Sequence, residues 1–109
     1  MFIKTTPPTL AGLNVETEIF SGFNDCGQAN ITAIAKGPAT LRKYGSLDRG
    51  LTWIAIGDSA LTTSPDGVWV VSLVADLVQI MGYTRYTIIS NAAGNTVAAN
   101  VVTGSFYLS

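Results

Sequence analysis

The side chains that could carry out acid–base or nucleophilic chemistry are seven carboxylates and one thiol, because the 109-residue chain contains no histidine. Histidine is the usual general base, the commonest metal ligand and the usual partner of a nucleophilic serine or cysteine. Cys26 follows Asp25, and an acidic neighbour disfavours the reactive thiolate. The residue types therefore predict a protein that is not an enzyme and has no catalytic residue.

The carboxylates are distributed as structural residues would be. They are Glu16, Glu18, Asp25, Asp48, Asp58, Asp66 and Asp76. The aspartates at positions 25, 48, 58 and 66 stand beside or inside glycine turns, where aspartate is expected for backbone geometry alone. Glu16 and Glu18 would share one face of a strand, which predicts a solvated face and leaves a paired acid–base site as the alternative. A calcium site would need Asp48 and Asp58 to converge, so we expect no metal site and no cofactor.

The segment Ser46-Leu-Asp-Arg-Gly-Leu-Thr-Trp53 has the strongest local signal for a turn. Its Asp-Arg pair fits the central positions of a type I turn, and Gly50 fits the left-handed residue after it, which predicts a three-residue hairpin loop. Short polar side chains can bond to the turn's own amides, and the tryptophan leaves the turn as an apolar anchor. The predicted structural hairpin residues are Ser46, Asp48, Gly50, Thr52 and Trp53.

The pattern Ser-x-Asp-x-Gly-x-Thr-Trp resembles the Asp-box, a hairpin motif repeated in sialidase-type propellers and found singly in other β proteins. All five defining positions match, over eight of the 109 residues. In that family the motif is a folding device, so the resemblance implies a hairpin and no activity. A propeller needs several four-stranded blades, whereas this chain has one box and no repeat, which excludes the propeller fold.

Short strand-like segments separated by turn residues make up the rest of the chain. Pro7 and Pro8 lack amide donors, so we expect residues 1–9 to form an extended N-terminal arm before a single domain over residues 10–109. The strand segments are 10–23, 29–35, 39–45, 53–57, 68–74, 83–90 and 96–108. A helix is the alternative for the later part of 68–81. Seven or eight strands without a long helix predict an all-β fold, an antiparallel β-sandwich or jelly-roll-like domain.

The composition predicts a surface with little charge. Charged residues make up 12% of the chain, about half of what is typical of soluble domains, and the mean hydropathy is +0.37. The segment 68–78 is apolar on both faces, as in a strand that is central in its sheet or covered by a partner. Its valines, Val68, Val70, Val74 and Val78, are the candidate interface. The alternative is a compact β domain rich in threonine, serine and asparagine.

Several partners are excluded by composition. The basic residues are interspersed with acids, so no patch for nucleic-acid phosphates is expected. The most apolar run, 68–81, is interrupted by polar residues and is shorter than the about 20 residues of a membrane span. The first residues do not resemble a signal peptide. A single cysteine permits no disulfide within the chain.

The layout resembles that of small phage capsid decoration (cement) proteins of the β-sandwich type. The resemblance rests on an irregular N-terminal segment, an Ala/Thr-rich strand, the Ser46–Trp53 hairpin and the aromatic-and-arginine strand around Tyr83–Tyr86. It implies a structural virion protein, made in the host cytoplasm and bound to the major capsid protein on the capsid surface. A homo-oligomer, a trimer, is also implied. Such a subunit would stabilise the phage head by bridging capsid subunits.

The alternative function is a carbohydrate-binding or adhesion module. Its sugar-stacking platform would consist of aromatic side chains exposed on a sandwich face, Trp53, Trp69, Tyr83, Tyr86 and Tyr44. Large aromatics in a small sandwich more often belong to the core, which favours the structural assignment. Arg85 lies between Thr84 and Tyr86. The sequence leaves open whether its side chain is buried with an acid or exposed at an interface.

Overall fold

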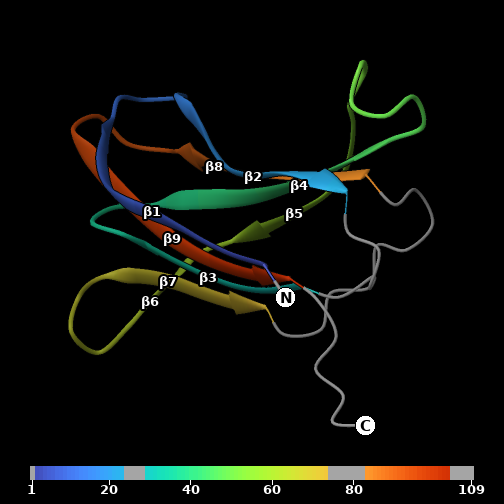
Figure 1. Ribbon diagram of the computed structural model, residues 1–109. Coiled ribbons are helices and arrows are strands. Elements are labelled where there is room, and N and C mark those ends of the chain that lie inside the picture. Colours follow the sequence, from blue (N-terminus) through green and yellow to red (C-terminus); the bar gives the residue numbers. More distant parts are fainter. Residues whose placement is uncertain (1, 24–28, 74–82, 104–109) are drawn as a thin grey trace, which may run out of the picture.

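The computed structural model describes residues 2–23, 29–73 and 83–103, and these residues form two antiparallel sheets (Figure 1). The strands are β1 Phe2–Ala11, β2 Glu16–Phe23, β3 Ala29–Ala35, β4 Ala39–Ser46, β5 Ile54–Ala60, β6 Thr62–Thr63, β7 Trp69–Leu73, β8 Tyr83–Ser90 and β9 Asn95–Thr103. No helix occurs among the described residues. The predicted all-β class is confirmed, with one strand more than expected. For the segment 68–74, predicted as a strand, residues Trp69–Leu73 form β7.

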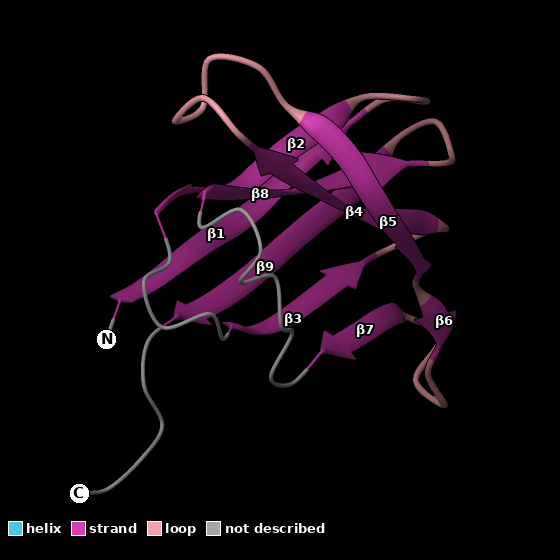
Figure 2. Ribbon diagram, turned by 90° about the vertical axis from the view of Figure 1, so that its right-hand side faces the viewer, coloured by secondary structure: helices cyan, strands magenta, loops and turns pink. Residues whose placement is uncertain are grey.

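The connections give the strand order of a jelly roll. One sheet has the order β1-β9-β3-β7-β6 and the other β2-β8-β4-β5. The chain changes sheet at every connection except β4–β5 and β6–β7, so the sheets are built together from strands distant in sequence. Figure 2 shows the two sheets lying face to face. The sandwich leaves two outer faces, one for each sheet.

The segment expected to be an N-terminal arm is extended and lies within the five-stranded sheet. It forms β1, which pairs with β9 from Phe2 opposite Thr103 to Ala11 opposite Asn95. The register shifts between Thr6 and Thr9, where the two prolines have no amide to donate. Proline is tolerated there because β1 is an edge strand.

The core fills the space between the sheets with alternate residues of each strand. From β3 and β9 come mostly small side chains, Ile31, Ala33, Ala35, Val97, Ala99 and Val101. The four-stranded sheet contributes larger ones, among them Leu41, Tyr86 and Ile88. Trp69 and Val71 of β7 pack against this core. Small side chains from one sheet and large ones from the other allow the two layers to pack densely.

A bulge in β2 explains an aromatic residue that is out of phase in the sequence. Ile19 and Phe20 are consecutive, yet both are buried. The register with β8 shifts between Glu18 and Phe20, which inserts one residue into β2. The Phe20 ring then reaches the core, with its centroid 6.1 Å from that of Tyr86.

Candidate functional site

The connection between β4 and β5, residues 47–53, stands clear of the four-stranded sheet (Figure 1). We call it the leucine loop, after Leu47 and Leu51. The predicted three-residue loop is wrong, because seven residues separate the strands. Arg49 as well as Gly50 has a positive φ, 60° and 90°, which a type I turn does not allow at its second central residue. The wider loop follows from side-chain bonds that span four residues.

Side-chain hydrogen bonds hold the leucine loop together, and they come from Ser46, Asp48 and Thr52. The Ser46 Oγ accepts hydrogen bonds from the amide of Gly50 at 2.8 Å and from that of Asp48 at 3.3 Å, and it donates to Asp48 Oδ1 at 2.8 Å. Asp48 accepts from the Thr52 amide at 2.8 Å and from the Thr52 hydroxyl at 2.5 Å. The prediction that short polar side chains bond the turn's own amides is confirmed for Ser46 and Asp48, whereas the Thr52 hydroxyl bonds to the Asp48 carboxylate.

The remaining predicted hairpin residues pack against each other. A Cβ added to Gly50 would lie 3.2 Å from Cζ2 of Trp53, so the tryptophan ring lies directly over the glycine. The Thr52 hydroxyl, followed by the Thr52 amide and the Ser46 hydroxyl, lowers the pKa of Asp48 to about 2. These contacts lie within the loop and its two flanking residues. The five residues therefore hold the shape of the loop.

We expect Asp48→Asn to lower stability at neutral pH and to matter less in acid. The folded-state pKa of Asp48 lies below its ordinary value of 3.8, so its contribution is present above that value and is lost as the pH falls from about 4 to about 2. The measurement is the melting temperature of both proteins from about pH 6 to pH 2. Their difference should shrink across that interval, and a constant difference would contradict the hydrogen bonds described.

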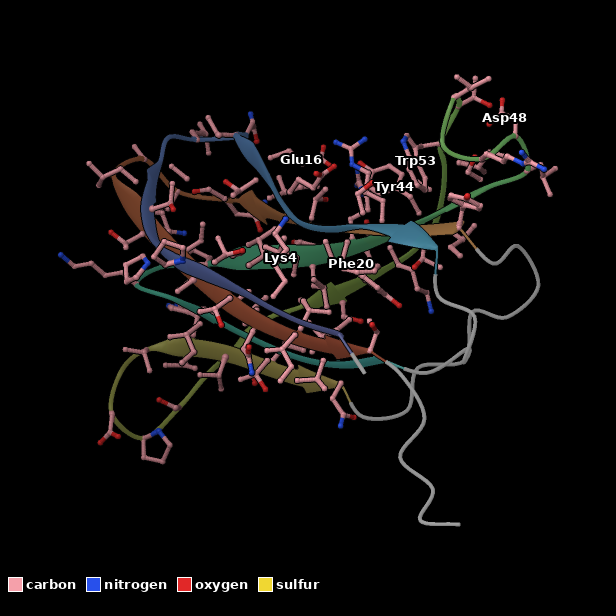
Figure 3. All side chains as sticks on the ribbon, viewed as in Figure 1. Lys4, Glu16, Phe20, Tyr44, Asp48 and Trp53 are labelled. Carbon is pink, nitrogen blue, oxygen red and sulfur yellow. The ribbon has the colours of Figure 1, made fainter. Side chains whose placement is uncertain are left out.

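The outer face of the four-stranded sheet, which we call the charged face, gathers charged residues in rows. One row across the register is Glu18, Thr87, Arg42 and Asp58. The neighbouring rows add Glu16 on one side, and Tyr44 and Arg85 on the other. Figure 3 shows Glu16 and Tyr44 rising from this side of the sheet, away from Phe20.

The groups on the charged face are paired with each other. Arg42 donates from Nε and Nη2 to the two carboxylate oxygens of Asp58, at 2.8 and 3.0 Å. Arg85 Nε lies 3.0 Å from Glu18 Oε1, and the guanidinium lies 5.1 Å from the centroid of the Tyr44 ring. Arg85 thus pairs with an acid and covers an aromatic ring.

Glu16 does not have the properties of a general acid. It accepts hydrogen bonds from the Tyr44 hydroxyl and, at 2.6 Å, from the Thr87 hydroxyl. Burial raises its pKa, but these two bonds and the charges of Arg85 and Arg42 outweigh burial, so the pKa lies below its usual range. A general acid needs a raised pKa. Glu16 and Glu18 share a face, as predicted, yet their contacts are those of a structural network.

The outer face of the five-stranded sheet has a different character, and we call it the uncharged face. The outward residues include Ile3, Thr5, Leu10, Asn30, Thr32, Ile34, Val70, Thr96, Ala98, Asn100 and Val102. Among the described residues that point outward here, the one charged side chain is Lys36, at the end of β3. Ile3 is 60% exposed and Ile34 45%.

Two adjacent apolar hollows lie on the uncharged face. Their volumes are about 220 and 310 Å³, and Pro8, Ile34 and Ala98 line both of them. The small side chain of Ala98 leaves a depression between the taller proline and isoleucine. Val68 lines the larger hollow, and Val70 lies half-buried beside Ile34. Of the candidate interface valines, these two are on the uncharged face, and Val74 and Val78 lie outside the described residues.

The five aromatics considered for a sugar platform are distributed between core and surface. Tyr86 is fully buried and Trp69 packs against the core. Tyr83 is half-buried on β8. Tyr44 lies beneath Arg85, and Trp53 lies over Gly50. Tyr44 and Trp53 stand on the same side of the four-stranded sheet in Figure 3, so at most part of the proposed platform is assembled.

The sequence interpretation missed the two hollows and the exposed leucines. Alternation in β3 and β9 places Ile34 and Ala98 outward, and this signal could have predicted an apolar face. Leu47 and Leu51, which flank the turn, are 76% and 85% exposed. Two leucines within a loop of polar residues are a recognisable pattern. The rows of the charged face needed the strand order β2-β8-β4-β5, which no local pattern contains.

In the described parts of the chain, no three His, Cys, Asp or Glu side chains gather as a metal site would require. Asp58 is bound by Arg42, and Asp48 by Ser46 and Thr52. Within the same residues, no helix has the length and apolar character needed to cross a membrane.

The geometry of this jelly roll therefore offers two contrasting outer faces and one rigid loop as its candidate functional surfaces. No protein-family model, curated protein or solved structure matches the chain.

Proposed function

We propose that this chain is a structural virion protein, a decoration subunit that binds the capsid surface and stabilises a phage head by bridging capsid subunits. The observation that supports this most directly is the contrast between the two outer faces. Five charged residues form a hydrogen-bonded and ion-paired network on one face, whereas the other has Lys36 as its one charged outward residue among those described. The uncharged face is the surface that meets neighbouring proteins.

Burial of the uncharged face is energetically cheap. Charged groups lose several kcal/mol of solvation when an interface covers them, whereas threonine, alanine and isoleucine lose little. The five strands differ in length, from ten residues in β1 to two in β6. With strands about 4.8 Å apart and about 3.3 Å for each residue, they give a face of roughly 520 Å². A standard interface buries about 800 Å² on each partner, so the face alone covers about two thirds of one such contact.

The charged face suits the opposite role. Paired charges that point to solvent keep a coated particle soluble. A subunit whose uncharged face spans the boundary between capsid subunits adds contacts to both of them. Separation of those subunits then requires several contacts to break together, which slows dissociation without any chemical step.

Two matched asparagines test the proposal. Asn100 on the uncharged face accepts a hydrogen bond from Thr5 Oγ1 at 3.2 Å, and Asn91 beyond β8 accepts one from Thr40 Oγ1 at 2.9 Å. Asn100→Asp keeps the acceptor and adds one charge to the proposed interface. We expect it to lower particle binding at least about tenfold, since an unpaired charge in an interface costs 2–5 kcal/mol or more. Asn91→Asp, with the same chemistry, should bind normally.

The measurement is the number of copies on purified particles, by quantitative mass spectrometry. Stoichiometric presence of the wild-type chain, together with selective loss of Asn100→Asp, supports the proposal. Absence of the wild-type chain from particles, or equal binding of the two variants, overturns it.

A further inference from the structure

The leucine loop and the larger hollow are both apolar surfaces exposed to solvent. Leu47 and Leu51 are 76% and 85% exposed on a loop that stands clear of its sheet (Figure 1). The larger hollow is apolar and has a volume of about 310 Å³. Removal of one leucine side chain from a protein core leaves a cavity of roughly 150 Å³. The hollow is open to solvent on one side, and it has room for a leucine side chain.

The loop is prepared for docking before it meets a partner. Hydrogen bonds of Ser46, Asp48 and Thr52 fix its backbone, and Trp53 packs over Gly50. A segment that is already ordered loses little conformational entropy when it binds. An ordered loop that holds two leucines in solvent is better explained as a docking element than as a flexible turn.

The charges of the two surfaces are compatible. Lys36 lines the hollow, and the loop carries Asp48 between its two leucines. Asp48 is ionised at neutral pH, because its pKa is lowered to about 2. Arg49 balances Asp48, so the loop as a whole is neutral and is not repelled by Lys36. An acid beside the leucines also gives the loop a means of orientation at the rim of the hollow.

We propose that the leucine loop of one copy docks into the larger hollow of a second copy. The loop follows the four-stranded sheet and the hollow lies on the outer face of the other sheet, so the contact is head to tail. Head-to-tail contacts close into rings when the rotation permits. This inference rests on the proposed function, because it divides the uncharged face between two partners. The area around Pro8 and Ala98 would contact a second copy, and the area around Ile3 and Asn100 would contact the capsid.

The first experiment measures the mass of the full chain in solution by light scattering after size-exclusion chromatography. Wild type should form a closed oligomer. Leu47→Ser with Leu51→Ser should be monomeric, because it removes both docking side chains. Neither side chain takes part in the hydrogen bonds of the loop, so the loop should keep its shape. Ala98→Arg, which fills the hollow from a different element, should also be monomeric. Leu13→Ser removes another exposed leucine, 58% exposed, and should leave the oligomer unchanged.

Mixing the two monomeric variants distinguishes this contact from any symmetric one. The Ala98→Arg chain retains its loop and the double-serine chain retains its hollow, so the mixture should give a 1:1 dimer and nothing larger. A monomeric wild type, an unchanged oligomer in either variant, or a mixture that stays monomeric would each overturn the inference. If the wild-type chain is a monomer in solution but is present stoichiometrically on particles, the docking contact is contradicted and the proposed function stands. If it is an oligomer but is absent from particles, the proposed function is contradicted and the docking contact stands.

Discussion

Gly50→Val should lower the melting temperature by more than about 10 °C, with a loss of roughly 3 kcal/mol of unfolding free energy. Gly50 has φ of 90°, a conformation that a β-branched residue adopts only under strain. The added Cβ would also lie 3.2 Å from the Trp53 ring, closer than an unstrained contact. The tryptophan must move, and the loop loses the packing that holds its return strand. Thermal and urea unfolding, followed by circular dichroism, measure the loss.

Gly67 provides the matched control for Gly50. Its φ is 84°, and no atom lies within 4 Å of an added Cβ. Gly67→Val therefore introduces the backbone strain without the steric contact, and we expect a loss of about 1–2 kcal/mol. The difference between the two variants reports the packing of Trp53 over Gly50. Equal losses at the two glycines would show that the contact contributes nothing, and an unchanged melting temperature for Gly50→Val would contradict the left-handed conformation.

The elements of this fold could be predicted wherever the signal was local. Tyr83–Ser90 is rich in aromatic and β-branched residues, and it forms β8 as expected. The side chains of Ser46 and Asp48 bond to nearby amides, so their role followed from spacing alone. The segment 29–35 was predicted as a strand, and it forms β3 without interruption.

The elements that failed depend on contacts between distant segments. Residues 1–9 were expected to be an extended N-terminal arm because the two prolines lack amide donors, but β9 lies alongside and pairs with them except at the bulge. The bulge at Ile19 reverses the inward and outward positions of β2, and only the register with β8 shows it. The contrast between the two faces arises from strand order. Neighbours such as β1 and β9 stand at opposite ends of the chain.

Asn95 illustrates a residue whose importance no local pattern showed, since the sequence placed it in a loop. It is 2% exposed at the start of β9. Its Oδ1 accepts hydrogen bonds from the amides of Gly37 and Thr96, each at 2.8 Å, and its Nδ2 donates to the carbonyls of Gly37 and Pro38 at 3.2 and 3.0 Å. One buried amide side chain thus holds the β3–β4 connection against β9, 58 residues later in the chain.

Asn95→Ala should cost about 3 kcal/mol, because it removes the hydrogen bonds to the amides of Gly37 and Thr96 and to the carbonyls of Gly37 and Pro38 while creating a small cavity. Asn91→Ala and Asn100→Ala each remove one exposed bond to a threonine, and we expect changes within about 0.5 kcal/mol. Urea unfolding of the three variants gives the comparison directly. Since Asn95 touches neither outer face nor the leucine loop, its loss should lower stability while leaving the mass in solution unchanged below the unfolding transition. If Asn95→Ala proved as stable as the two exposed controls, the connection between β3 and β4 would have to be held by its backbone contacts alone, namely Lys36 with Thr96 and Asn91 with Pro38.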